Sequence, residues 1–342
     1  MKDLRHFIDT QDFSKRELLD MMELMAMLKR SRKLGAVPRL LEGASLAMIF
    51  EEPSTRTRVS FEVAMELLGG HALYLKPGEI HLGQRESLHD TAKVLSRMCD
   101  VIMARTLEHK TVLGLAEHCT VPVLNGLTDY NHPTQVVADV FTMSEHLPEG
   151  KKLEDLKVVF ISDRTNVCSS LMHMTTKMGM NFAHIAPKKY QSPREWVDIA
   201  LSNIKENGGS VKVTDDMNEI VGADIIYTDL WWWVGQEHEA EERVAAFKPT
   251  YQVTQDVMKK AGPHAKFMHC LPASRNVEAM DDVMDGPQSI IFDQSENRLT
   301  AQMALLVYFT YPRLAKASAE LKAFCKAQAE DFLNNDQRIW NQ

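Results

Sequence analysis

The sequence lacks the cysteine pattern of a disulfide-bonded or zinc-binding protein. Its five cysteines are scattered over 342 residues, and no two of them form a Cys-x-x-Cys pair. It also lacks an apolar run long enough to cross a bilayer, and its first residues lack the apolar segment of a secretory signal. We therefore expect a cytoplasmic protein with no metal site and no membrane partner.

Excess positive charge and glycine-rich phosphate loops are absent as well. The formal net charge is -8 and there is no basic run, which argues against a nucleic-acid partner. Neither a dinucleotide-binding glycine fingerprint nor a P-loop occurs, which argues against a nucleotide-binding α/β enzyme. Arginines placed locally within an acidic protein indicate a small anionic ligand instead.

The chain length and the alternation of apolar segments predict two domains. Short apolar runs typical of buried strands alternate with segments of helical periodicity, as in parallel sheets covered by helices on both faces. The expected fold is α/β, with two tandem open parallel-sheet domains at 1–148 and 149–312, divided at a stretch rich in Pro, Gly and charge. A last helix within 313–342 should pack back on the first domain or on a neighbouring subunit.

The expected elements can be given by residue range. Strands are expected at 45–50, 72–75, 101–105, 121–125, 157–161, 181–185, 223–227, 266–269 and 289–292. Helices are expected at 14–30, 59–68, 87–98, 110–119, 132–146, 166–179, 193–207, 237–247, 254–261, 298–311 and 314–333. In open parallel sheets ligands bind at the carboxyl ends of strands, so the residues after each strand are candidate site residues.

A turn rich in hydroxyl and guanidinium groups follows the first strand and opens a helix. It reads Ser54-Thr55-Arg56-Thr57-Arg58. The free N–H groups of the first helical turn and the helix dipole favour an anion there. Because Arg56 and Arg58 are two residues apart, they diverge on a helix and only one should face the anion. The alternative is an ordinary helix capped by Ser54 with a solvent-exposed arginine pair.

Two further first-domain strands end on polar candidates. Arg105 ends an apolar strand, and a buried arginine needs a partner anion, which is either a ligand or an internal carboxylate. His132 and Gln135 are three residues apart at a helix start, so both can face one point. A histidine near a helix N-terminus is shifted toward its neutral form, which still donates one hydrogen bond. The alternative is a capping histidine and a solvent-exposed glutamine.

The second domain places a carboxylate and amides after its strands. Asp229 suits a cationic amine, or else it caps the next helix; Asp163 and Asn166 follow an earlier strand. Cys270 follows His269 directly, and adjacent strand residues point to opposite faces, so His269 is poorly placed as its base. We expect Cys270 to polarise the ligand rather than to act as a covalent nucleophile. The run Trp231–Trp233 has hydrophobic core as its commoner interpretation.

Together these residues favour one class of reaction. The first domain offers arginines, hydroxyls and a helix N-terminus, which suit a phosphate joined to a carbonyl group. The second domain offers a carboxylate, which suits a cationic amine. The sequence therefore predicts acyl transfer from an activated acyl phosphate to an amine.

The motifs also resemble those of the aspartate and ornithine carbamoyltransferase family. Ser-Thr-Arg-Thr-Arg, His-Pro-Thr-Gln and His-Cys-Leu-Pro occur here in the family order, with matching spacing to Arg105 and Arg298. The resemblance covers essentially the whole chain. It implies a carbamoyl-phosphate-binding first domain, an amine-binding second domain and no cofactor. It also implies a homotrimer with the active site at the subunit boundary. A loop of the neighbouring subunit, here Glu79–Gln84, would reach this site. Ornithine enzymes commonly carry Gln where this sequence has His81.

The resemblance assigns roles to particular residues. It implies catalytic roles for Arg56, Arg105, His132 and Cys270. The residues implied to bind carbamoyl phosphate are Ser54, Thr55, Arg56, Thr57, Arg105, His132, Gln135, Cys270, Leu271 and Arg298. Those implied to bind the acceptor are Asn166, Asp229, Trp233 and Val234.

The acceptor part of the sequence departs from the ornithine type. Ornithine enzymes carry Ser-Met-Gly where Trp233-Val234-Gly235 stands here. Replacing a small hydroxyl by an indole removes a polar partner and disfavours an α-carboxylate. The stretch 146–155 and the C-terminal helix resemble those of putrescine carbamoyltransferases, although these carry a small residue at the Trp233 position. Putrescine is therefore the first expectation and ornithine or another amine the second, with a non-catalytic ligand-binding relative as the alternative in a different class.

Overall fold

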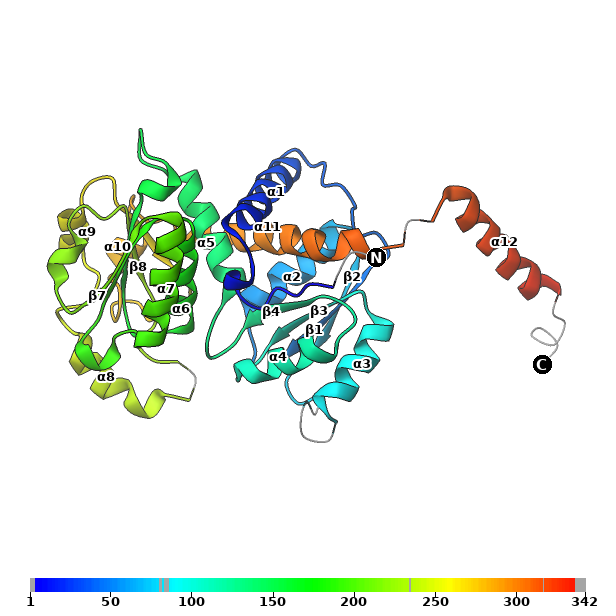
Figure 1. Ribbon diagram of the computed structural model, residues 1–342, viewed down its shortest axis with the longest axis horizontal. Helices are drawn as coiled ribbons and strands as arrows, with labels where there is room; N and C mark the ends of the chain where they lie inside the picture. Colours follow the sequence, from blue (N-terminus) through cyan, green and yellow to red (C-terminus); the bar gives the residue numbers. More distant parts are fainter. Residues whose placement is uncertain (1–3, 80–81, 83–85, 234, 316, 336–342) are drawn as a thin grey trace.

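The computed structural model describes residues 4–79, 82, 86–233, 235–315 and 317–335. Two α/β domains lie side by side, each built on an open parallel sheet with helices on both faces (Figure 1). The expected fold class is confirmed. None of the described helices is both long and apolar enough to span a membrane.

The first sheet has the strand order β2-β1-β3-β4, and all its pairs are parallel. Its strands are β1 (Ser45–Phe50), β2 (His71–Leu75), β3 (Val101–Arg105) and β4 (Val123–Leu127). Its helices are α2 (Thr55–Leu67), α3 (Leu88–Met98), α4 (His109–His118) and α5 (Pro133–Glu145). Phe50 pairs with Arg105, so the turn after β1 and the last residue of β3 meet at one edge of the sheet.

The second sheet has the order β7-β6-β5-β8-β9, again with parallel pairs. Its strands are β5 (Lys157–Ile161), β6 (Asn181–Ile185), β7 (Ser210–Thr214), β8 (Ile225–Thr228) and β9 (Lys266–His269). Its helices are α6 (Asn166–Lys177), α7 (Arg194–Asn207), α8 (Ala240–Phe247), α9 (Gln255–Ala261) and α10 (Asp281–Met284). Thr228 pairs with His269, which brings Asp229 and Cys270 to the same edge of this sheet.

Two expectations about the second sheet are wrong. The strand expected at 289–292 is absent: only Ser289 bridges to Phe267, and helix α11 (Ile291–Thr310) begins where the strand should continue. Apolar residues at a buried helix start have the same local pattern as a buried strand. Strand β7 was not expected, because an edge strand that is partly exposed alternates polar and apolar residues instead of forming an apolar run.

Helix α11 carries the end of the second domain's sequence back onto the first domain. It packs against α1 (Lys15–Lys33), α2 and α5, and Figure 1 shows it beside α1 and α2. The helix begins seven residues before the expected position at 298. The core therefore runs continuously from α1 through α11 and α5 into α6 of the second domain.

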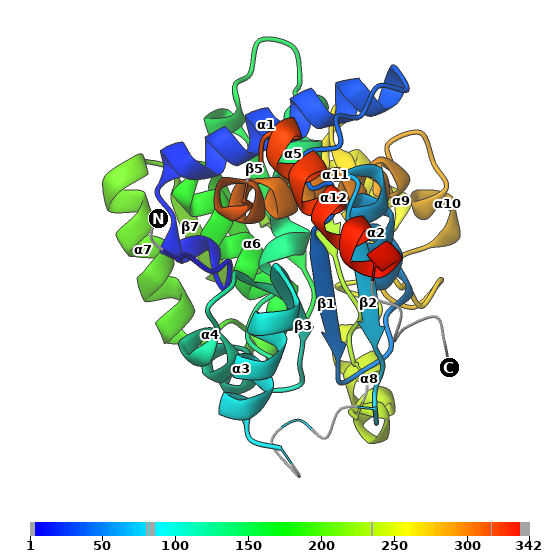
Figure 2. The ribbon, with the colours of Figure 1, turned by 90° about the vertical axis from the view of Figure 1, so that its right-hand side faces the viewer.

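The last helix, α12 (Ala319–Asn335), projects from the body of the molecule (Figure 1), and in Figure 2 it lies in front of the first domain, toward the viewer. Every residue from 317 to 334 is exposed. The helix does not pack back on the first domain of its own chain. Of the two sequence expectations for this segment, only packing on a neighbouring subunit stays a prediction.

Candidate active site

A cavity of about 690 Å³ lies between the domains, where the carboxyl ends of the two sheets face each other. It gathers the candidates from both domains: Ser54, Thr55, Arg56, Thr57, Arg105, His132, Gln135, Asn166, Asp229, Trp233, Cys270, Leu271 and Arg298 all line it. Val234 and His81 lie outside the described residues. Candidates from separate segments of the sequence therefore line one cavity.

The N-terminus of α2 presents free donors to this cavity. Ser54 occupies the N-cap position, yet its side chain makes no capping hydrogen bond, so its hydroxyl is not used by the helix. Arg58 points away: it pairs with Glu62 at 3.1 Å and its guanidinium carbon lies 3.9 Å from the centroid of the Tyr74 ring. Only Arg56 of the pair lines the cavity, in agreement with the prediction that one of the two would face inward.

Three guanidinium groups, those of Arg56, Arg105 and Arg298, line the same cavity. Among the described residues, no carboxylate lies within salt-bridge distance of any of them. Burial, together with the other two arginines, lowers the pKa of Arg105 to about 10. Burial likewise lowers the pKa of Arg298 to about 10. An ion pair of Arg105 with an internal carboxylate is therefore not seen among the described residues, although the Glu52 carboxylate opposes part of the decrease in its pKa.

His132 is the N-cap residue of α5 and is almost fully buried. Its pKa is lowered well below the ordinary value by burial first, and then by Arg298, Arg105 and Arg56. The expected neutral form is thus maintained chiefly by desolvation and by nearby cations. Its side chain makes no capping bond, so the capping alternative is not seen.

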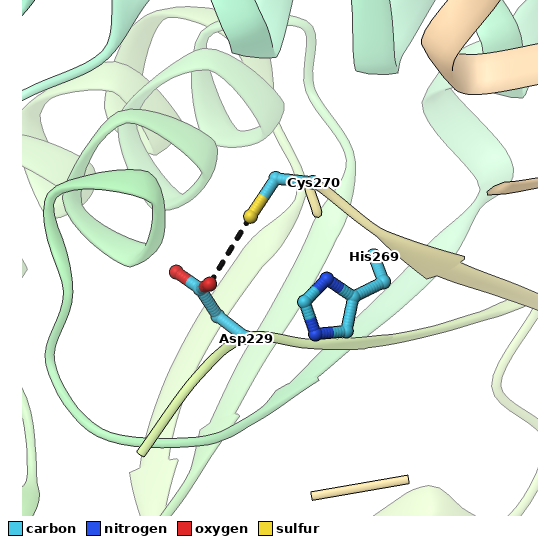
Figure 3. Close-up of side chains that lie close together, drawn as sticks. All are labelled: Asp229, His269 and Cys270. Carbon is cyan, nitrogen blue, oxygen red and sulfur yellow. Dashed lines mark hydrogen bonds between the residues drawn. The ribbon is translucent and has the colours of Figure 1, made fainter. Parts of the chain in front are cut away.

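The opposite wall carries one carboxylate that is tightly held. The Oδ1 atom of Asp229 accepts hydrogen bonds from Leu230 N (2.8 Å) and Cys270 Sγ (3.1 Å), and Thr165 Oγ1 donates to Oδ2 at 2.8 Å (Figure 3). Asp229 caps no helix. Burial, followed by the Asp229 carboxylate, raises the pKa of Cys270 well above its ordinary value. Cys270 is therefore a protonated donor to Asp229, which is unsuitable for a thiolate nucleophile.

Asp229, His269 and Cys270 come close enough together to raise the question of a metal site. Their ligand atoms all lie within 4.8 Å of one another. However, His269 Nδ1 accepts a hydrogen bond from Leu271 N (2.8 Å), so its Nε2 carries the proton and donates to Glu278 (3.2 Å). Neither ring nitrogen has a free lone pair, so this cluster does not fit a metal ion as it stands.

Several neighbours of the candidates serve structural roles instead. Asp163 forms a buried ion pair with Arg243, which also donates to the carbonyl of Trp231 (2.8 Å) and so anchors the base of the loop after β8. Trp231 is fully buried and stacks on Phe247, as expected for core, whereas Trp233 lines the cavity. The tryptophan run therefore divides between core and site.

Sequence reasoning missed part of the cavity wall. Glu52, Asp129, Thr165 and Gln236 also line it. Glu52 lies two residues before Ser54, and Thr165 lies one residue before Asn166. Considering every residue that directly follows each strand would have included both. Asp129 and Gln236 are in irregular segments, where no periodicity indicates which side chain faces inward.

A cavity in which arginines and a helix N-terminus face a carboxylate across two α/β domains is typical of a group-transfer enzyme. The comparisons with known proteins agree. The carbamoyl-P binding domain model of aspartate/ornithine carbamoyltransferases matches residues 5–145, and their Asp/Orn binding domain model matches 154–309. The chain belongs to the aspartate/ornithine carbamoyltransferase family, and it is a transferase.

Individual relatives differ in how much of the chain they match. The chain is 66% identical to a putrescine carbamoyltransferase of Mycoplasma capricolum subsp. capricolum, over 100% of this chain and 96% of that protein. It is 47% identical to the anabolic ornithine carbamoyltransferase of Pyrococcus furiosus, over 88% of this chain and 95% of that protein. The solved structure of ornithine carbamoyltransferase from Pyrococcus furiosus superposes with a TM-score of 0.86 at 46% identity, covering 91% of this chain and 98% of that one.

Proposed function

We propose that this protein transfers the carbamoyl group of carbamoyl phosphate to putrescine, giving N-carbamoylputrescine and phosphate in a reversible reaction. The observation that supports this proposal most is the 66% identity to a putrescine carbamoyltransferase over the whole chain. The identity to the ornithine carbamoyltransferase is 47%, over 88% of the chain. Residues 1–148 would bind carbamoyl phosphate and 149–312 the amine.

Carbamoyl phosphate would bind on the arginine side of the cavity. The α2 N-terminus, Ser54, Thr55 and Arg56 would hold the phosphate, because unpaired N–H groups and a guanidinium are matched to its oxygens. Arg105, the neutral His132 and Thr57 would surround the carbonyl oxygen. Gln135, Cys270, Leu271 and Arg298 would complete the site. This arrangement is supported by the absence of a described carboxylate within ion-pair distance of the three arginines.

The proposed step is a nucleophilic substitution at the carbonyl carbon. The lone pair of a neutral amine forms the new C–N bond, and the carbonyl oxygen takes up negative charge in the tetrahedral intermediate. The C–O bond to phosphate then breaks, phosphate leaves with that electron pair, and the amine nitrogen gives a proton to it. Donors aimed at the carbonyl oxygen and at the leaving phosphate stabilise this transition state more than the ground state.

Putrescine would lie toward Asp229, with one amine at the carbonyl carbon and the other end held as an ammonium. Asp229 supplies the carboxylate, Asn166 also lines the cavity, and Trp233 supplies apolar surface. Val234 is proposed to belong to this wall from the family pattern alone. An indole in place of a small hydroxyl removes that hydroxyl and takes up the space of an α-carboxylate, which would cost binding energy for ornithine.

Product formation against a panel of amines tests this proposal. Carbamoyl phosphate would be supplied with putrescine, ornithine, lysine and agmatine at equal concentrations, and ureido product measured. Putrescine should give the highest kcat/KM. A clear preference for ornithine would replace the acceptor, and tight carbamoyl phosphate binding without any turnover would indicate a binding relative.

We further propose a cytoplasmic homotrimer in which α12 packs on a neighbouring subunit. The helix exposes Leu321, Phe324, Phe332 and Leu333, which is apolar surface that a second copy would bury. All five cysteines are free thiols, as suits a reducing compartment. A contact from His81 of a neighbour to the active site belongs to the same proposal.

A further inference from the structure

A buried carboxyl group behind the cavity is not accounted for by substrate binding. Asp139 lies on α5 and is fully buried. Its Oδ1 accepts hydrogen bonds from the side-chain amides of Gln135 (2.8 Å) and Gln294 (2.8 Å), and its Oδ2 accepts one from the hydroxyl of Tyr227 (3.0 Å). Asp139 does not line the cavity.

The partners of Asp139 lead to both walls of the active site. Tyr227 is on β8, two residues before Asp229. Gln294 is on α11, and its Oε1 accepts a hydrogen bond from the backbone N–H of His269 (3.0 Å), the residue before Cys270. One carboxylate thus connects α5 to the ends of the two strands that carry the acceptor wall.

On the carbamoyl phosphate side, Asp139 acts through the Gln135 amide. Gln135 Nε2 donates to Asp139, and Gln135 Oε1 accepts from Arg298 Nη1 (2.5 Å). Arg298 Nη2 also donates to Thr57 Oγ1 (3.0 Å). The side-chain amide of Gln135 lies between the Asp139 carboxylate and the Arg298 guanidinium, so only one of its two orientations is favourable. In the reversed orientation its NH2 group would face the guanidinium donors and its oxygen would face the carboxylate.

We propose that Asp139 is a positioning residue of the reaction: it fixes the amide of Gln135, and through it Arg298, relative to the strand ends that carry Asp229 and Cys270. This inference rests on the proposed carbamoyl transfer. A carboxylate is required for it, because only a group with two acceptor atoms and no hydrogen can receive all three donors at once. Keeping a carboxylate charged when it is this deeply buried costs free energy. A neutral side chain could accept structural hydrogen bonds without this cost.

The variant Asp139→Asn tests the proposal with almost no change in volume. Its amide hydrogens would face Tyr227 or the glutamine amides, so the Gln135 amide must turn or lose its bond. We expect kcat to fall by about 10²-fold, the scale of a small misplacement of reacting groups, and the KM for carbamoyl phosphate to rise. The matched control is Asp224→Asn, at a buried carboxylate directly before β8 that accepts a hydrogen bond from Lys151 (2.6 Å), and it should leave kcat unchanged.

A second variant serves if Asp139→Asn does not fold. Tyr227→Phe substitutes no cavity residue. It removes one of the three donors to Asp139 and also the acceptor of a hydrogen bond from Gln294 Nε2 (3.0 Å), and we expect kcat to fall by about tenfold. Values of kcat within threefold of wild type for both variants would overturn the proposal, as would an equal loss in Asp224→Asn. If the wild type carbamoylates no amine, the proposed function fails. In that case the affinity for carbamoyl phosphate, measured by tryptophan fluorescence, tests the positioning role separately. An affinity in Asp139→Asn equal to that of the wild type would overturn this role.

The pH profile supplies a readout that a merely structural role would not change. The groups that face Asp139 are Tyr227 from β8, Arg298 from α11 and Cys270 after β9. Burial raises the pKa of Asp139 to about 6, against the opposing effect of its three hydrogen bonds. Wild-type kcat should therefore fall as pH decreases through about 6, where Asp139 takes up a proton. In Asp139→Asn, kcat should be low and should show no such fall. A decrease of kcat through about pH 6 equal to that of the wild type would contradict the assignment.

Discussion

At the scale of single residues, Arg105 brings a positive charge into the cavity without a carboxylate at salt-bridge distance among the described residues. In the proposed reaction it would stabilise the carbonyl oxygen as this oxygen takes up negative charge. We expect Arg105→Ala to lower kcat by about 10²-fold or more, measured as ureido product from carbamoyl phosphate and putrescine. Arg194→Ala is the control, because Arg194 is an exposed residue of α7 paired with Asp198. Near-wild-type turnover of Arg105→Ala would remove it from the mechanism.

The identity of residue 233 decides, in our proposal, which amine is accepted. Trp233→Ser restores a small hydroxyl and opens space for an α-carboxylate, so the ratio of kcat/KM for ornithine to that for putrescine should rise. We expect a change of about tenfold, the size of one hydrogen bond to a charged group. The neighbouring Trp232 packs against the second-domain core, so Trp232→Ser should leave this ratio unchanged. A constant ratio in Trp233→Ser would show that the indole does not set specificity.

At the scale of elements, a partly buried ion pair between α1 and α5 also binds Asn297 of α11. Lys29 on α1 donates to both carboxylate oxygens of Glu145 on α5 (2.8 and 2.7 Å) and to Asn297 Oδ1 on α11 (2.8 Å). Lys29→Met removes these bonds and should lower the free energy of unfolding by about 2–3 kcal/mol, measured by urea denaturation. The pair Arg32–Glu296 also joins α1 to α11, but it is solvent-exposed, so Arg32→Met should cost about 0.5 kcal/mol. Equal decreases in the free energy of unfolding for the two variants would show that burial does not determine how much each ion pair contributes to stability.

At the scale of the whole molecule, the exposed position of α12 has a consequence for assembly. A chain that ends at residue 318 lacks α12, in which every residue up to 334 is exposed. We expect its thermal midpoint at high dilution to match that of the full chain, while sedimentation velocity shows weaker self-association. Phe324→Ser should weaken association in the same direction. An unchanged association constant in both variants would mean that α12 packs on no neighbouring subunit.

Much of the site was readable from the sequence because its residues directly follow strands. Parallel pairing then brings these strand ends to one edge, as Phe50 with Arg105 and Thr228 with His269 show. Local geometry also predicted that only one of Arg56 and Arg58 would face the cavity, although not which one, and that His132 would be neutral. The cause of that neutrality was not, since burial and three arginines dominate the pKa of His132.

The sequence by itself determined the α/β class, the two domains and the order of the motifs, because each depends on residues close together in the chain. Only the tertiary structure decided that α11 returns to the first domain, that α12 stands clear of it, and that β7 completes the second sheet. It alone revealed Asp139, whose partners Tyr227 and Gln294 are 88 and 155 residues away. Local periodicity reports whether a side chain is buried, whereas hydrogen bonds between distant elements depend on how these elements pack.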